Sequence, residues 1–222
     1  MFGQLGRLIN RVTLSDRSYC FLFEAEPGNE AVSLDCETTG FDHWVDEIVS
    51  IAAIRISGAR IHASSAFRAL VRPEATMRPA SIKVHQLRQQ DVAQARAMTD
   101  VLPELLHFIG SRPLVGYWIQ FDVRMLDKYM LAMLNTRLPN RRIDVSELYY
   151  DRKYGHAPPG TRIDLRYAAI RADLKLPVRA QHDAFEDALG AAEMYLLLED
   201  LRARNVRLPR QQSDIRGNFA IA

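Results

Sequence analysis

The chain has 222 residues, a length that corresponds to one compact domain with additional segments or to two small domains. Hydrophobic residues make up 48% of the chain and charged residues 25%, the balance of a folded globular protein, which excludes a disordered or fibrous chain. The 29 lysines and arginines and the 27 acids leave a net charge of +2, which is too small to indicate a surface that coats nucleic acid.

Cysteine content and hydropathy point to a compartment. The chain has two cysteines, Cys20 and Cys36, which excludes a disulfide framework and favours a reducing compartment. No run of residues approaches the roughly 18 apolar positions of a membrane span. The first residues also lack the features of a secretory signal peptide. We therefore expect a cytoplasmic protein with no membrane partner.

Residues 1–29 are predicted to form an extension before the main domain. Turn-forming residues at 26–30 mark its end. It includes an apolar patch at 19–23 and an amphipathic helix whose apolar side chains are Phe2, Leu5, Leu8, Ile9 and Val12. These side chains could pack on the domain, on a second copy or on a polymerase, and their sequence favours none of the three.

The strands and helices that follow predict the fold class. Strand patterns come first and then alternate with helices, at 31–35, 47–56, 60–71, 113–116 and 142–144. Helical periodicity marks 99–109, 121–134, 145–150, 165–172 and 184–202. This order is typical of an α/β domain in which an antiparallel meander and then parallel strands form a mixed five-stranded sheet flanked by helices. We assign this domain to residues 30–203 and a basic tail to 204–222.

Two carboxylates lie at the end of the first predicted strand, where residues 34–40 read LDCETTG. Because side chains alternate along a strand, Asp35 and Glu37 point to one face and repel each other. No lysine or arginine lies within seven positions of either, so a hard divalent cation is a natural partner. Taken alone, the motif is better explained as a pair of solvated acids.

Further acids and a histidine come later in the chain. Asp122 lies in the opening turn of a predicted helix, where an acid is also ordinary because the helix dipole favours an anion. Asp183 is followed three residues later by Glu186, which is the spacing of an N-cap residue and its partner at the start of a helix. His182 would then lie on a loop before the helix, with Asp187 in or just beyond the first turn. A surface histidine beside a well-capped helix explains this segment equally well.

Four acids from three elements form a set that is too costly to desolvate without about two divalent ions. Two ions roughly 4 Å apart stabilise both the attacking and the leaving oxygen in phosphodiester cleavage. An imidazole with an ordinary pKa of roughly 6.5 could take a proton from the attacking water near neutral pH. The candidate residues are Asp35, Glu37, Asp122, Asp187 and His182.

This pattern resembles the DEDD superfamily of 3′–5′ exonucleases in its histidine subclass, and most of all the epsilon subunit of bacterial DNA polymerase III and its stand-alone relatives. The resemblance covers about residues 31–201 and matches all five catalytic positions in order and spacing. A tyrosine four residues before the last acid would mark the other subclass, and Asp183 occupies that position. The matching segments are 34–40, 82–87, 114–122, 143–144 and 182–187. The resemblance implies a ribonuclease H-like fold.

The resemblance also implies a role for each residue. Asp35 would bridge two Mg²⁺ or Mn²⁺ ions, and Glu37 and Asp187 would complete the site that holds the nucleophilic water. Asp122 would support the second ion, and His182 would be the general base. The 3′-terminal nucleotide would be contacted by Thr38, Thr39, Gly40 and His85. The last of these could equally be a packed or exposed loop histidine.

Two segments depart from the family pattern. The family usually has His-Asn-x-x-Phe-Asp before the third acid, whereas residues 117–122 read YWIQFD, with Trp118 in place of the asparagine. After His85, Gln86 and Leu87 replace the commoner Gly-Ile. None of these positions is a predicted metal ligand, so we expect them to alter substrate geometry rather than activity.

The implied function is a two-metal-dependent exonuclease that releases nucleoside 5′-monophosphates from the 3′ ends of single-stranded DNA or RNA. Proofreading beside a DNA polymerase subunit, repair and RNA trimming use the same five residues, so the sequence does not separate them. The alternative is a non-catalytic nucleic-acid-binding or polymerase-associated interaction protein that keeps the fold. The complete five-residue set argues against this alternative.

The tail has two interpretations. Residues 202–216 contain five arginines and one acid, Asp214, which could help to hold phosphates. A solvated, partly disordered end is the simpler account. Residues 211–219 weakly resemble a peptide that docks on a sliding clamp or polymerase.

Overall fold

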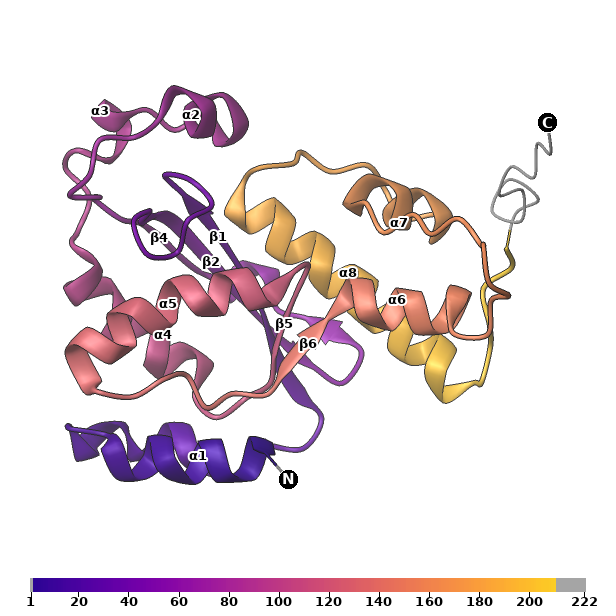
Figure 1. The fold of residues 1–222 in the computed structure, drawn as a ribbon, viewed down its shortest axis with the longest axis horizontal. Helices are drawn as coiled ribbons and strands as arrows, with labels where there is room; N and C mark the ends of the chain where they lie inside the picture. The colour runs from indigo at the N-terminus through magenta and orange to yellow at the C-terminus, as the bar shows by residue number, and fades with distance from the viewer. Residues whose placement is uncertain (1, 211–222) are drawn as a thin grey trace.

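A computed structural model describes residues 2–210 (Figure 1). Its centre is one mixed sheet with the strand order β3-β2-β1-β5-β6, and β4 also pairs with β2. The strands are β1 (Glu30–Thr38), β2 (Ile48–Ser57), β3 (Arg60–Ile61), β4 (Phe67–Leu70), β5 (Leu114–Gly116) and β6 (Arg142–Asp144). The first four pair antiparallel, whereas β1, β5 and β6 run parallel. This arrangement confirms the predicted α/β class with a mixed sheet.

The sheet has six strands within the described residues, one more than the sequence analysis gives. The segment expected to form one long third strand is divided into β3 and β4, which both pair with β2. Between them, a 3₁₀ turn at Ala63–Ser65 interrupts the ladder. Its side chains are small, so they bury little surface that would hold the backbone extended.

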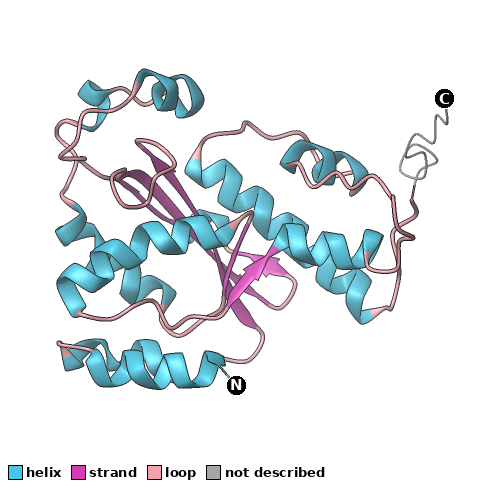
Figure 2. Cartoon of the chain, in the orientation of Figure 1, coloured by secondary structure: helices cyan, strands magenta, loops and turns pink. Residues whose placement is uncertain are grey.

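The helices cover both faces of the sheet (Figure 2). They are α1 (Phe2–Thr13), α2 (Pro79–His85), α3 (Gln89–Val92), α4 (Met98–Ile109), α5 (Ile119–Leu134), α6 (Val145–Tyr154), α7 (Tyr167–Asp173) and α8 (Ala184–Ala203). On one face, α4 and α5 pack on Leu34, Cys36 and Ile51. On the other face, α8 packs on Ala52 and Ile54. Neighbouring residues of one strand therefore belong to different layers, as the period of two requires.

The N-terminal extension packs on the domain. After α1, a 3₁₀ helix (Arg17–Phe23) buries Leu22 and Phe23 in the same core cluster as α4 and α5. The backbone N–H of Ser15 donates to the carbonyl of Leu134 at 3.0 Å, which ties the extension to the end of α5. The apolar side chains of the extension were expected to pack on the domain, on a second copy or on a polymerase. At least the segment Arg17–Phe23 packs on the domain.

The C-terminal segment runs back along the domain after α8. The backbone N–H of Leu208 donates to the carbonyl of Arg152 at the end of α6. The peptide expected at 211–219 lies outside the described residues. Within residues 2–210, no helix combines the length and the apolarity needed to cross a membrane.

Removing the Leu22 side chain tests whether the extension belongs to the core. Leu22 is fully buried, so we expect Leu22→Ala to lower the free energy of unfolding by about 2–5 kcal/mol in urea denaturation. Val12→Ala is the control because Val12 is 68% exposed, and it should change stability by less than about 0.5 kcal/mol. Equal denaturation midpoints for wild type and Leu22→Ala would contradict this role.

Candidate active site

The end of β1 carries the first two acids of the predicted site. Leu34 and Cys36 are buried against α4 and α5, so the alternate residues Asp35 and Glu37 point to the face covered by α8. The pairing with β2 becomes irregular between Glu37 and Thr38. Such an irregularity bends a strand end and re-aims its side chains, here toward the start of α8.

Asp122 reaches the same strand end from the first turn of α5. It is 4% exposed, and its Oδ1 accepts a hydrogen bond from the backbone N–H of Cys36 at 3.0 Å. The preceding turn passes close to β1 because Gly116 has no side chain. A Cβ there would lie 2.9 Å from the carbonyl oxygen of Leu34. The glycine therefore lets β5 and α5 approach the strand that holds the other acids.

The start of α8 holds the histidine and the last acid. The Asp183 carboxylate accepts hydrogen bonds from the backbone N–H groups of Phe185 and Glu186, both at 3.0 Å, so Asp183 is the N-cap as predicted. His182 precedes the helix, has a positive φ of 65° and is exposed. Its backbone N–H donates to Oδ2 of Asp187 at 2.7 Å. The cap therefore joins the histidine loop and the acid in one local unit.

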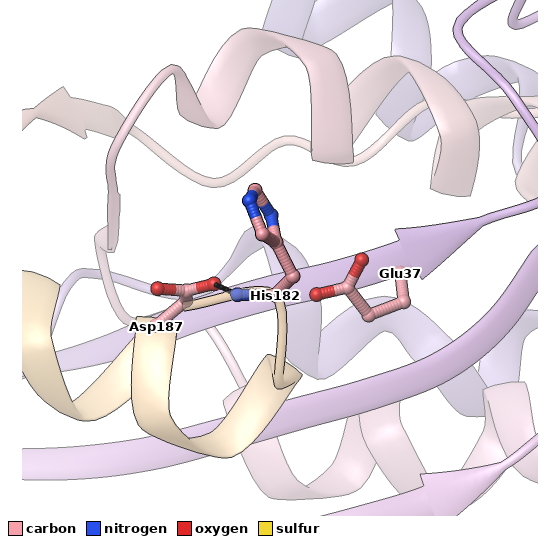
Figure 3. Close-up of side chains that lie close together, drawn as sticks. All are labelled: Glu37, His182 and Asp187. Atoms are coloured by element: carbon pink, nitrogen blue, oxygen red, sulfur yellow. Dashed lines mark hydrogen bonds between the residues drawn. The ribbon is translucent and has the colours of Figure 1, made fainter. Parts of the chain in front are cut away.

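Three of the predicted residues meet at one point (Figure 3). Glu37, His182 and Asp187 each offer one ligand atom, and these atoms lie within 4.8 Å of one another. Figure 3 shows the Glu37 carboxylate pointing toward the other two side chains from β1. Carboxylate oxygens and an imidazole nitrogen are a donor set that suits a divalent ion.

Asp35 and Asp122 lie beside this group and share its electrostatics. Burial, followed by the negative charges of Asp122 and Asp187, raises the pKa of Asp35 well above its ordinary value. Burial also raises the pKa of Asp122, although the N–H of Cys36 opposes the shift. Burial and the charge of Asp187 raise the pKa of Glu37 to about 7. Each acid makes its neighbours harder to ionise.

No basic side chain relieves this repulsion. Within residues 2–210, none of the four acids forms an ion pair with lysine or arginine. A group of buried and half-buried carboxylates without a cationic partner fits a divalent metal ion, whose charge would remove the penalty on ionisation. The residues present therefore fit the metal that the sequence pattern predicts.

The last residue of β1 and the loop after it contain three of the predicted substrate contacts. The hydroxyl of Thr38 donates to the carbonyl of Gly40 at 2.6 Å. The hydroxyl of Thr39 donates to Asp46 at 3.1 Å and accepts from the backbone N–H of Glu47 at 3.0 Å. A side chain at Gly40 would overlap the Asp46 carboxylate. These side chains shape the loop, and their contact with a nucleotide stays a prediction.

His85 is a packed histidine, and its contact with a nucleotide stays a prediction. The side chain is buried, and its Nδ1 accepts the backbone N–H of Leu87 at 3.1 Å. Its Nε2 is buried and has no hydrogen-bond partner in the described part of the chain. Burial lowers the pKa of His85. The backbone of Thr38 opposes this shift, and the His182 ring adds to it. The packed histidine therefore lies beside the site, and its Nε2 has no hydrogen-bond partner among the described residues.

Exposed aromatic rings lie on the segments that flank the site, and of these the sequence indicates a role only for Trp118, as a change in substrate geometry. Phe41 and Trp44, in the loop after Gly40, are 83% and 78% exposed. Trp118, which precedes α5, is 61% exposed and has a positive φ of 57°. The replacement of the family's asparagine was the only sequence signal, because solvent exposure depends on the packed fold.

A second residue without any signal in the sequence is Tyr167 at the start of α7. Its hydroxyl is buried. Burial, followed by the charge of Asp187, raises its pKa, which ties it to the acidic site. Helical periodicity does not distinguish such a side chain from an ordinary core residue.

Comparison with known proteins agrees with this geometry. Residues 32–195 match the Exonuclease family, RNase_T. A DNA polymerase III subunit epsilon-like protein of Rhodobacter capsulatus is 32% identical over 180 residues, which cover 79% of this chain and 24% of that protein. DNA polymerase III subunit epsilon of Aquifex aeolicus is 27% identical over 77% of this chain and 81% of its own length.

A solved structure supports the fold. The structure described as Exonuclease X in complex with 5′ overhanging duplex DNA aligns with a TM-score of 0.59 and 23% identity, over 80% of this chain and 95% of that chain. This chain spans about a quarter of the length of the Rhodobacter capsulatus relative. From the matched family, the epsilon relatives and the shared fold, we conclude that the chain belongs to the exonuclease family, resembles the DNA polymerase III epsilon subunit and has a ribonuclease H-like fold.

Proposed function

We propose that this protein is a 3′–5′ exonuclease that hydrolyses phosphodiester bonds at the 3′ ends of single-stranded DNA and releases nucleoside 5′-monophosphates. The observation that carries the proposal is the convergence of Glu37, His182 and Asp187 beside the half-buried Asp35 and the buried Asp122. The acids come from β1, α5 and α8, so only the folded domain brings them together.

The carboxylates of Asp35, Glu37, Asp122 and Asp187 would hold two divalent ions, Mg²⁺ or Mn²⁺. When bound, such ions stabilise the attacking and leaving oxygens of the phosphodiester. The chain contributes orientation. The N–H of Cys36 fixes Asp122, and the N–H of His182 fixes Asp187, so these two carboxylates are held before an ion arrives.

His182 would act as the general base. Its imidazole lies within reach of Glu37 and Asp187 and is exposed, so it can take a proton from a water at the site and return it to solvent. The cap at Asp183 holds the loop rigidly behind the ring. A metal ligand would instead have to remain unprotonated throughout the cycle, and this difference makes the two roles separable.

The exposed rings support a single-stranded substrate. Phe41, Trp44 and Trp118 lie on segments that lead directly into or out of the acidic site. Unpaired bases stack on such rings, with about 1–3 kcal/mol gained per base. We favour DNA as the substrate and a DNA polymerase subunit as a partner, in the cytoplasm. One relative is named DNA polymerase III subunit epsilon, and another is named as an epsilon-like protein.

A cleavage assay tests the function. With 5′-labelled single-stranded DNA and RNA in Mg²⁺ or Mn²⁺, we expect wild type to give a ladder of shortened DNA that disappears with chelator. Asp187→Asn should abolish the ladder because it removes a charge from the site, whereas Asp200→Asn, an exposed acid on the same helix, should leave it intact. If wild type cleaves neither substrate, the protein is a non-catalytic member of the family. Preference for RNA would correct the substrate alone.

The cleavage assay and a metal-binding measurement together show whether His182 is a general base or a metal ligand. As a general base it should contribute about 10²–10⁴-fold to kcat, so His182→Ala should lower kcat by that factor. Binding of Mn²⁺, measured by calorimetry, should change less than twofold. A large loss of Mn²⁺ affinity would instead identify His182 as a ligand.

The metal-free protein should lose stability as the pH rises. The folded-state pKa of Glu37 is about 7, above its ordinary value of 4.5, so between these values the folded state holds a proton that the unfolded state has lost. At about 1.4 kcal/mol per pKa unit, the free energy of unfolding in EDTA should fall by on the order of 1–3 kcal/mol from pH 4.5 to 7.5 because of Glu37.

Urea denaturation at several pH values measures this effect. Glu37→Gln should flatten the dependence, and Glu147→Gln, an exposed acid on α6, should not. Added Mg²⁺ should restore stability above pH 7 because it neutralises the acids. A stability that rises with pH in EDTA, equally in wild type and Glu37→Gln, would contradict the strained acidic site.

Replacing Trp118 should raise stability and weaken substrate binding together. A bulky residue with positive φ costs about 1–3 kcal/mol, and asparagine tolerates that conformation. We expect Trp118→Asn to stabilise the protein by about 1 kcal/mol and to raise KM for single-stranded DNA about 5- to 100-fold. Trp118→Phe keeps a ring and should keep most of the affinity. An unchanged KM in Trp118→Asn would exclude stacking at this position.

A further inference from the structure

One hydroxyl is buried beside the acidic site without a partner. The ring of Tyr167 is half-buried, and its Oη is buried with no hydrogen-bond partner within residues 2–210. A buried polar group left unpaired costs roughly 1–3 kcal/mol, so such a group calls for an explanation. The largest effect of a charge on the pKa of Tyr167 comes from Asp187, followed by Arg171 and then Asp35, so the hydroxyl lies close to the acidic site.

The hydroxyl uses space that a glycine leaves open. A Cβ at Gly190 would overlap Tyr167 Oη, so any side chain there would displace the hydroxyl. Gly190 lies inside α8, where glycine costs about 0.5–1 kcal/mol relative to alanine. It also lies three residues after Asp187, on the same face of the helix. The helix thus has a destabilising residue at the position that admits the phenol to the site.

Two side chains, Tyr117 and Arg171, hold the Tyr167 ring in this place. Tyr117 packs against it edge-on, with ring centroids 5.3 Å apart and an interplanar angle of 72°. The Tyr117 hydroxyl is itself fixed by donating to the carbonyl of Leu165 at 2.9 Å. The buried Arg171 lies 5.7 Å from the Tyr167 ring centroid and donates to the carbonyl of Gly190 at 3.1 Å. The ring is therefore oriented by α7, α8 and the segment after β5.

Asp187, which lies one helical turn before Gly190 on α8, has room for another donor. Asp187 accepts one strong hydrogen bond, from the N–H of His182 to its Oδ2. Burial raises the pKa of Asp187, and the N–H of His182 and the Tyr167 hydroxyl act in the opposite direction. The Tyr167 hydroxyl makes no hydrogen bond with any described residue, so it remains available as a donor.

We propose that Tyr167 is a positioning residue that donates a hydrogen bond to the Asp187 carboxylate when the site holds its divalent ions. This inference rests on the proposed metal-dependent function. Two donors from different helices, the N–H of His182 and the hydroxyl of Tyr167, would fix the plane of the carboxylate. Fixing a ligand in this way typically changes metal affinity 10- to 100-fold. Gly190 and Tyr117 are the parts of the chain that make the contact sterically possible.

Tyr167→Phe tests the proposal because it removes only the hydroxyl. Calorimetric titration with Mn²⁺ should give an affinity about 10-fold weaker than that of wild type, and kcat on single-stranded DNA should fall about as much with KM for DNA unchanged. The metal-free protein should be as stable as wild type or more stable, because the lost hydroxyl has no partner. Tyr150→Phe, a partly exposed tyrosine on α6, is the control and should change none of these values.

A second variant reaches the same contact from α8. Gly190→Ala should displace the hydroxyl and weaken Mn²⁺ binding about as much as Tyr167→Phe does. The double variant should bind Mn²⁺ no more weakly than either single variant, since both remove one interaction. Equal Mn²⁺ affinity in wild type and Tyr167→Phe would overturn the role of Tyr167, and cleavage by wild type would leave the proposed function standing. Wild type that binds Mn²⁺ but cleaves no nucleic acid would overturn only the proposed function.

Discussion

Mutual repulsion among carboxylates at the end of β1 is the constraint on which the rest of this site depends. Burial and neighbouring charge raise the pKa of Asp35 and Glu37, and burial raises that of Asp122 and Asp187. In the described part of the chain, backbone N–H groups donate to Asp122 and Asp187, and no lysine or arginine forms an ion pair with any of the four acids. Backbone donors orient a carboxylate without neutralising it, so the balancing charge is left to an ion.

The scaffold holds these repelling groups in place through short local devices. The Asp183 cap fixes the start of α8, and Gly116 lets the start of α5 approach β1. Arg179 pairs with Glu186 and Glu193, so the loop that carries the exposed histidine is tied to α8 on its far side. Each device is paired inside the structure, whereas the acids have no balancing positive charge among the described residues.

The two family departures at neighbouring positions act in opposite directions. Tyr117 turns inward and packs on Tyr167, whose hydroxyl fills the space above Gly190. Trp118 turns outward in a strained backbone conformation and presents its ring to solvent. In the proposed enzyme, the first departure would bear on how a metal ligand is held, and the second on how a base is bound. A change of two adjacent residues would then affect both metal binding and substrate binding, because the turn separates their side chains.

The sequence alone determined the features that depend on local rules. Strand alternation assigned Asp35 and Glu37 to one face, N-cap spacing put His182 outside α8, and the order of strands and helices predicted the mixed sheet. Only the tertiary structure decided that Leu22 joins the core, that a turn divides the third strand, and that Tyr167 meets Gly190. These outcomes depend on contacts between residues distant in the chain. Such contacts leave no period or spacing in the sequence, because only the packed volume of the folded domain selects them.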